Sequence, residues 1–212
     1  MSNTQSTGFK PVRHLNGAPW NGQTIKCWIE ASHSGSLFVG DPVVLTGSSD
    51  PTTGAYPTVG IASAGAGNPV FGVITSFDAN PTDLTSMYFP TGTTTGRFCN
   101  VCWVGDVLFE AQGNSAGVIA YTDVGSNVAL VATPDGATTG DTTTGNSSWC
   151  INYTGMTTTS SLQARIMGAV DRADNDITAI YAKWLVFMNI NQLTTPASNA
   201  SAGTTYIGAL GV

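Results

Sequence analysis

The apolar residues of this chain come in short runs, and most of these runs end at Gly, Pro, Asp or Asn. Short runs rich in Val, Ile, Phe, Tyr and Thr and bounded by turn formers are typical of β-strands. They are too short for amphipathic helices, which need about ten to twelve residues at a period of 3.6. The pattern therefore predicts an all-β protein, with a barrel-like or sandwich-like domain of short antiparallel strands. The expected strands are residues 25–31, 36–39, 42–46, 58–62, 70–77, 86–89, 97–104, 107–112, 117–121, 127–132, 149–153, 162–170 and 182–189.

The N-terminal segment, residues 1–24, differs from the rest of the chain. It mixes Gly and Pro with apolar side chains that follow neither a strand nor a helix period, and it is too rich in turn formers to fold alone. We expect an extended docking arm, with an arm that lies on its own domain as the alternative. Its apolar members are Phe9, Val12, Leu15 and Trp20.

The middle of the chain, residues 25–192, is expected to form one β-rich core domain. A stretch rich in Thr, Gly and Ser at 133–148 leaves open a division into two subdomains there, because such segments lack the apolar area to fold independently. Residues 193–212 are expected to form a flexible tail, and its last apolar patch suggests a second docking peptide. That patch consists of Tyr206, Ile207 and Leu210.

The chain is poor in the groups on which catalysis depends. Charged residues make up 9% of it, whereas enzymes hold titratable groups close together to transfer protons and stabilise charge. The two histidines, His14 and His33, have no recognisable triad context, and no nucleophile elbow, phosphate loop or dinucleotide fingerprint is present. We therefore expect a structural or interaction protein, not an enzyme, and assign no catalytic residue.

Net charge and hydropathy further limit the kinds of partner that the protein is expected to bind. The formal net charge is −6 and no basic run exists, which argues against nucleic acid because phosphate contacts need clustered Lys and Arg. No stretch approaches the ~20 apolar residues of a membrane span, and residues 1–10 lack the apolar segment of a secretory leader. We expect a soluble protein made in a cytosol, with neither nucleic acid nor membrane as a partner.

Two patterns resemble metal sites without meeting their requirements. Cys99 and Cys102 have the spacing of half a zinc site, but residues three apart on the expected strand point to opposite faces. The acidic run Asp171, Asp174 and Asp176 alternates like a calcium loop, yet it lacks the turn glycine and the distal glutamate. Small buried thiols and a polar hairpin turn are the preferred interpretations, so no metal or cofactor is expected. The other two cysteines are Cys27 and Cys150.

Five tryptophans leave one binding function open. Aromatic faces stack on sugar rings, so exposed tryptophans lining a groove would favour a carbohydrate-binding or adhesion module. Most of them lie in or beside expected strands, where core or subunit interfaces are the commoner location. The five are Trp20, Trp28, Trp103, Trp149 and Trp184.

Several segments, in order over residues 1–192, resemble the head-decoration or capsid cement proteins of tailed bacteriophages. The tail after Gln192 has no counterpart in that family. The similar segments are GFKPVRHLNG (8–17), LFVGDPV (37–43), VFGVI (70–74), DVGSN (123–127), IMGAVDR (166–172) and KWLVFMNIN (183–191).

The resemblance implies a virion protein on the outer surface of the mature capsid, made in the host cytoplasm and often trimeric. Its partners would be the major capsid protein and other copies of itself, since it would stabilise the head by bridging coat subunits. We expect the capsid contact in the N-terminal arm, with apolar anchors and two cations that meet an acidic coat surface. The alternatives are another virion role, such as a head fibre base or tail component, or the carbohydrate-binding module. The expected contact residues are Phe9, Lys10, Val12, Arg13, Leu15 and Trp20.

Overall fold

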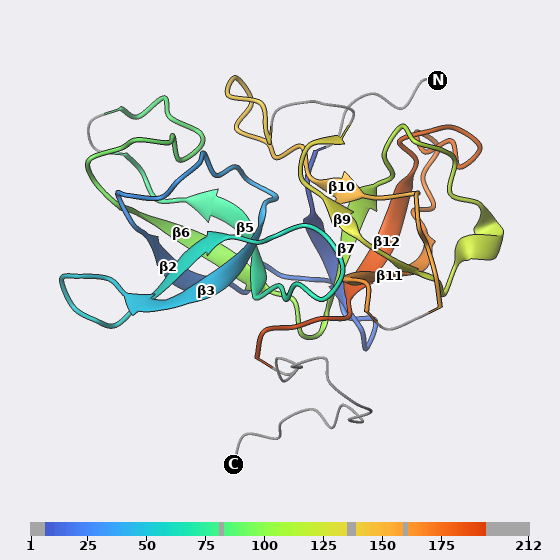
Figure 1. Cartoon of the computed structure of the whole chain (residues 1–212), viewed down its shortest axis with the longest axis horizontal. Coiled ribbons are helices and arrows are strands. Elements are labelled where there is room, and N and C mark those ends of the chain that lie inside the picture. Colours follow the sequence, from blue (N-terminus) through green and yellow to red (C-terminus); the bar gives the residue numbers. More distant parts are fainter. Residues whose placement is uncertain (1–6, 81–82, 135–138, 159–160, 194–212) are drawn as a thin grey trace, which may run out of the picture.

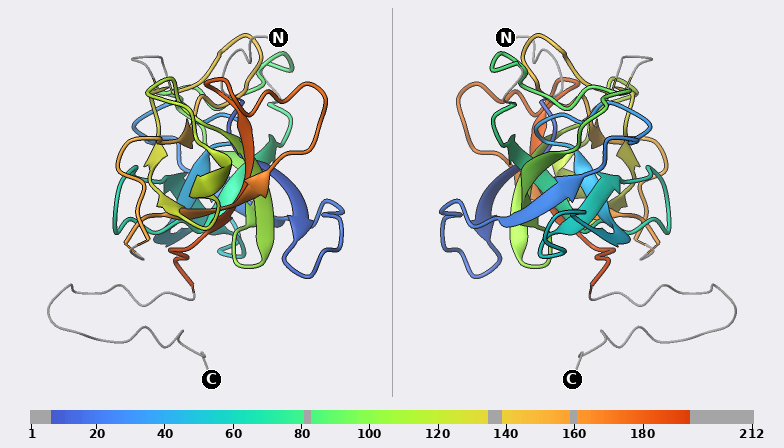
Figure 2. Two further views of the ribbon diagram at one scale, coloured as in Figure 1. Left: turned by 90° about the vertical axis from the view of Figure 1, so that its right-hand side faces the viewer. Right: turned by 90° about the vertical axis from the view of Figure 1, so that its left-hand side faces the viewer.

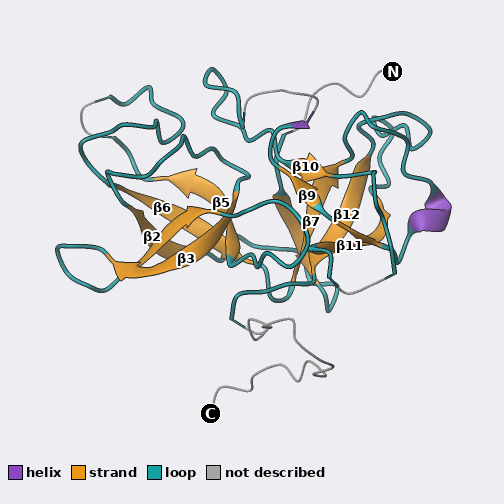
Figure 3. Cartoon of the chain, viewed as in Figure 1, coloured by secondary structure: helices purple, strands orange, loops and turns teal. Residues whose placement is uncertain are grey.

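The computed structural model describes residues 7–80, 83–134, 139–158 and 161–193. In these ranges the chain consists mainly of strands and loops and includes the short 3-10 helix η1 (Tyr121–Asp123), and none of its described helices is long and apolar enough to cross a membrane. The strands form two assemblies that lie side by side (Figure 1, Figure 3). The all-β prediction is confirmed. The apolar patch expected at 206–210 lies outside the described residues.

The first assembly is a closed barrel. Its strands follow one another in the order β2-β4-β3-β5-β6, and all pairs are antiparallel except the parallel pair β2 and β4. Alternate residues point inward and are fully buried, among them Cys27, Ile29 and Val101. The strands are β2 (Ile25–Ile29), β3 (Pro42–Ser49), β4 (Pro57–Ile61), β5 (Gly72–Phe77) and β6 (Arg97–Trp103).

The second assembly is a five-stranded antiparallel sheet in the order β1-β7-β12-β11-β8. A two-stranded ladder of β9 (Leu130–Val131) and β10 (Cys150–Ile151) belongs to the same half of the molecule. The buried face carries Phe109, Trp184 and Val186. The five strands are β1 (Lys10–His14), β7 (Val107–Gln112), β8 (Asn127–Val128), β11 (Ala164–Ala169) and β12 (Lys183–Met188).

One apolar core joins the two assemblies. It combines Val73 and Cys102 of the barrel with Phe109 and Trp184 of the sheet, so residues of both assemblies exclude water together. The chain passes from the barrel to the sheet between β6 and β7, and not in the stretch 133–148 where the sequence left a division open.

Residues 139–148 lie against the barrel instead of separating two units. The backbone of Val39 accepts a hydrogen bond from Ser147 N–H (2.8 Å) and donates one to the Gly145 carbonyl (2.9 Å). This segment has few apolar side chains, so backbone pairing with residues far away in the sequence holds it in place.

The N-terminal segment is a strand of its own domain and not an irregular arm. β1 pairs with β7, with Lys10 opposite Glu110 and His14 opposite Val107. Just before β1, Phe9 donates its N–H to the Gly40 carbonyl at 3.0 Å and buries its ring in the shared core. This is the alternative that the sequence left open, an arm that lies on its own domain.

Three of the expected strands do not form ladders. Residues 36–39 and 86–89 pair through the single bridge between Leu37 and Phe89, and the Phe38 ring stacks on Tyr88. Residues 117–120 lie in the loop that leads into η1 and Tyr121 begins that helix, since Gly117 and the surrounding polar residues favour irregular backbone.

Candidate protein-docking surface

The five-stranded sheet has one face in the core and one face turned away from it. Along β12, Trp184 and Val186 are fully buried, whereas Leu185 and Phe187 alternate with them and are half-buried. Successive residues of a strand point to opposite faces of the sheet, so Leu185 and Phe187 lie on the side that faces away from the core. We call this side, with the outward residues of β1, β7, β11 and β12, the outer face.

The register of the strands aligns outward side chains into rows across the sheet. The first row places Leu108 and Phe187 next to each other with an arginine at each end, in the order Arg13, Leu108, Phe187, Arg165. Directly opposite residues on paired strands have Cβ atoms about 4.5–5.5 Å apart and interact. Leu108 is 5% exposed, so the half-buried Phe187 supplies the open apolar surface of this row, between the cations Arg13 and Arg165. The second row runs Lys10, Glu110, Leu185.

Most of the cations in this acidic protein lie on this sheet or beside it. The chain has seven Lys and Arg residues, and only Lys26 and Arg97 belong to the barrel. The other five are Lys10, Arg13, Arg165, Arg172 and Lys183.

Some of these cations are paired and some are free of acidic partners. Arg172 contacts Glu110 at 2.9 Å, and Lys183 contacts Asp174 at 2.8 Å. In the part of the chain that the structure describes, Lys10 and Arg13 form no ion pair and both are exposed. The margin of the outer face formed by β1 therefore carries two exposed cations outside any ion pair in the described residues, with Glu110, opposite Lys10, bonded to Arg172 instead.

β1 and the residues that follow it form a hairpin (10–20, the β1 hairpin). Trp20 N–H donates to the Val12 carbonyl at 3.0 Å, and His14 N–H donates to the Ala18 carbonyl at 2.8 Å. Figure 2 shows its tip projecting at one side of the molecule. The Val12 carbonyl and the His14 N–H on the open edge of β1 are thereby paired within the chain, which protects this part of the edge from uncontrolled strand addition.

Two contacts fix the tip of the β1 hairpin to the sheet. The His14 ring lies between the carboxylate of Asp106, at 3.0 Å, and the side-chain carbonyl of Gln23, at 3.1 Å. The N–H of Leu15 donates to the Asp106 carbonyl at 2.8 Å. The exposed side chains of the hairpin are therefore presented by an ordered backbone, which lowers the entropy lost on binding.

Four of the six expected contact residues lie together and exposed on this hairpin. Val12 and Leu15 expose 39% and 49% of their surface. The other two are Lys10 and Arg13.

The remaining two expected contact residues have a different role. Phe9 is 1% exposed and belongs to the core, so its ring is not a surface anchor in this structure. It is buried because Gly8 allows the chain to approach Gly40 closely. Trp20 is half-buried, packs against the same core and donates its indole N–H to the Gln23 carbonyl at 3.3 Å.

Sequence reasoning missed the part of the surface that lies outside the N-terminal segment. Leu108, Phe187 and Arg165 come from β7, β12 and β11, and only strand pairing brings them beside Arg13. The strand 183–188 did carry a signal. It has apolar residues on both alternating sets, which indicates a strand with apolar contacts on both faces.

The described residues contain no grouping of three or more His, Cys, Asp or Glu side chains that could hold a metal ion. Cys99 and Cys102 belong to different core clusters, as expected for residues three apart on a strand. Burial raises the pKa of Cys27 and of Cys102 to about 12, so both thiols stay protonated and unreactive at neutral pH.

The acidic run 171–176 is a turn stabilised by ion pairs. The Asp174 carboxylate contacts both Lys183, at 2.8 Å, and Arg172, at 3.2 Å, and its hydrogen bond with Lys183 lowers its pKa. Asp176 accepts hydrogen bonds from Thr178, at 2.6 Å from the hydroxyl. The Asp174 and Asp176 carboxylates are therefore engaged in contacts within the turn. The same turn positions Arg172 next to Glu110 on the outer face.

Comparison of the chain with models of protein families, with curated proteins and with solved structures finds no match in any of the three.

Proposed function

We propose that this protein is a decoration protein of a tailed-phage head, which binds the outer surface of the mature capsid and stabilises it by bridging coat subunits. The observation that carries the proposal is the β1 hairpin, where exposed Val12 and Leu15 stand beside Lys10 and Arg13, two cations without acidic partners in the described part of the chain. The family resemblance of the sequence supports it.

Such a surface fits a partner that is apolar and acidic. Exposed apolar residues supply the contact area, and unpaired cations steer the encounter and fix its register. A protein that binds only the assembled lattice stabilises that lattice by mass action. Several copies linked into one unit, here a homotrimer, would add avidity because each further contact becomes intramolecular.

The stoichiometry of purified virus particles tests the class of function. Quantitative mass spectrometry of gradient-purified particles should count this chain at a ratio near one to one with the major coat protein. A few copies per particle would favour the alternative of a fibre base or tail component. Absence of the chain from the particles would refute a virion role altogether.

Point substitutions test the docking surface more cleanly than deletion of residues 1–24. That deletion would remove β1 from the sheet and Phe9 from the core. Lys10→Glu with Arg13→Glu should instead weaken binding to capsids stripped of the protein roughly a hundredfold, because two attractive charge contacts become repulsive. Lys26→Glu on the barrel, which breaks the pair with Asp78, is the charge control for each single variant, Lys10→Glu and Arg13→Glu, because all three change the net charge by the same amount. Equal binding by the double variant and by the control would refute the surface.

A further inference from the structure

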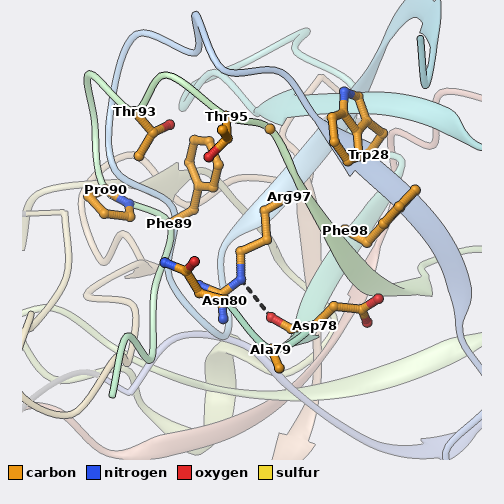
Figure 4. A pocket seen from close by; sticks show the side chains of 11 residues that line it. Trp28, Asp78, Ala79, Asn80, Phe89, Pro90, Thr93, Thr95, Arg97 and Phe98 are labelled. Carbon is orange, nitrogen blue, oxygen red and sulfur yellow. Dashed lines mark hydrogen bonds between the residues drawn. The ribbon is translucent and has the colours of Figure 1, made fainter. Parts of the chain in front are cut away.

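A cleft of about 290 Å³ opens on the barrel, where β2 and β6 meet the loop that follows β5. Figure 4 shows Trp28 and Phe98 on one side of it and Phe89, Thr93 and Thr95 on the other. None of these residues belongs to the outer face, so the cleft is a second surface feature with its own chemistry. Its volume is at the lower end of the range of small-molecule sites, ~300–1,000 Å³.

The aromatic side of the cleft is held in a fixed orientation. The ring of Trp28 lies against Gly96 so closely that a Cβ on that glycine would stand 2.2 Å from the ring. The ring of Phe98 meets Trp28 edge to face, with centroids 4.7 Å apart. The Lys26 ammonium lies 4.5 Å from the Phe98 centroid. Trp28 is only half-buried, so aromatic surface remains open beside the cleft.

Arg97 holds the polar side of the cleft. Its guanidinium donates to three backbone carbonyls, those of Asp78 (2.6 Å), Tyr88 (3.0 Å) and Ser86 (3.1 Å). These bonds tie the segments before and after residues 81–82 to the start of β6. The wall is therefore organised before any ligand arrives, which reduces the entropy lost on binding.

The charges around the cleft balance, because the two cations Lys26 and Arg97 are matched by Asp78 and by Asp83, whose charge acts on Arg97. The Asp78 carboxylate pairs with Lys26 at 2.8 Å, and Arg97 directs its donors to carbonyls. An anionic ligand would meet the Asp78 carboxylate, and a cationic ligand would meet Lys26 and Arg97. The cleft thus favours an uncharged ligand with both an apolar face and hydrogen-bonding edges.

We propose that this cleft binds the ring of a neutral sugar, a single hexopyranose unit of a larger glycan. The C–H face of a pyranose suits the part of the Trp28 ring that remains exposed, and Thr95 and Asp78, which also line the cleft, supply hydrogen-bonding side chains for its hydroxyl groups. A cleft of this volume has room for a single ring. This proposal does not depend on the capsid function.

Saturation-transfer NMR on the full chain tests the proposal with named probes. The panel contains glucose, galactose, mannose and N-acetylglucosamine with their methyl glycosides, and sialic acid and glucose 6-phosphate as charged counterparts. At least one neutral sugar at about 10 mM should receive saturation, since a single-ring site is expected to bind at millimolar affinity.

Two pairs of variants locate the site. Trp28→Ala should raise the Kd at least about tenfold, as loss of an aromatic anchor does, whereas Trp103→Ala should leave it unchanged. Trp103 is the matched control because it is half-buried at the other end of β6 and also lies against a glycine, Gly105. Thr95→Trp should block the cleft from its exposed rim, and Thr94→Trp, one residue along and outside the lining, should not.

Three results would overturn the proposal. The first is a folded protein that transfers no saturation to any neutral sugar in the panel. The second is binding of the charged sugars alone. The third is a neutral sugar whose Kd is the same in Thr95→Trp as in Thr94→Trp, which would place the sugar elsewhere even if Trp28→Ala failed to fold.

Discussion

The carboxylate of Asp41 is completely buried and accepts a hydrogen bond of 2.8 Å from the backbone N–H of Phe38. Ser147 bonds to the same side chain, while Oδ1 has no partner among the described residues. Burial raises the pKa of Asp41 from 3.8 to about 7. A buried carboxylate with an unsatisfied oxygen costs stability when it is ionised.

The stability of the protein should therefore depend on pH through Asp41. Because the folded state holds this proton more tightly than the unfolded state, the cost of ionisation is fully present above pH ~7 and disappears as the pH falls toward the unfolded value. As the pH is lowered from about 7 toward 3.8, the unfolding free energy of the wild-type protein should increase relative to that of Asp41→Asn, by at most about 1.4 kcal/mol for each pH unit. Urea denaturation of both proteins between pH 4.5 and 8 measures the difference, and parallel profiles would refute the assignment.

Asp50 should produce the opposite dependence in a different window. It is 2% exposed and accepts the N–H groups of Thr52, Thr53 and Tyr56 at 2.8–3.2 Å. These bonds to backbone N–H groups and to the Thr53 hydroxyl lower its pKa to about 2. Its contribution to stability is present above pH 3.8 and is lost as the pH falls toward 2.

Hydrogen exchange measures the role of Asp50 directly. In Asp50→Ala the amides of Thr53 and Tyr56 should exchange roughly tenfold faster at neutral pH, because the carboxylate that accepts their hydrogen bonds is gone. The amides of β7, in the other assembly, serve as the internal control. Unchanged protection of Thr53 would show that the loop between β3 and β4 is ordered by something else.

Gly8→Ala should destabilise the protein strongly. A Cβ at residue 8 would stand 2.6 Å from the Ser147 Cβ and 2.9 Å from the Gly40 backbone, and φ is +70°. We expect a loss of about 2–4 kcal/mol from overpacking and strain together. Gly22→Ala separates the two effects, because its φ is +91° with open space around it, and it should cost only about 1 kcal/mol. Thermal unfolding of both variants gives the comparison, and equal losses would contradict the close packing.

His14→Ala should loosen the β1 hairpin while leaving the global fold in place. The pair His14 and Asp106 is at the surface, with 54% of the Asp106 side chain exposed, so its removal should change the unfolding free energy by less than about 1 kcal/mol. The Leu15 amide, which donates to the Asp106 carbonyl, should nevertheless lose protection from exchange. If the hairpin binds the capsid, this variant should also bind several times more weakly. If the variant binds capsids as tightly as the wild type while its Leu15 amide exchanges faster, capsid binding does not depend on an ordered hairpin.

The sequence by itself determined the class of the fold and the positions of its strongest strands. Residues 107–112 were expected as a strand and form β7 with the same bounds, and 97–104 and 182–189 differ from β6 and β12 by one residue at one or both ends. These strands are predictable because β-branched and aromatic residues between turn formers are a local signal that needs no knowledge of neighbours. The opposite orientation of Cys99 and Cys102 follows from the same local geometry.

The tertiary structure decided which strands are neighbours, and with that the surface and the cleft. β1 has no alternating pattern of its own and becomes a strand because the edge of β7 offers it hydrogen bonds. Arg13 and Arg165 are far apart in sequence, and they bracket Leu108 and Phe187 only through the register of four strands. Alternation along a strand tells which residues share a face, but the register between strands depends on hydrogen bonds and packing across the whole core. Phe9 is the clearest case. No local sequence pattern indicates which residues its ring packs against, because the core that buries it is assembled from both halves of the chain.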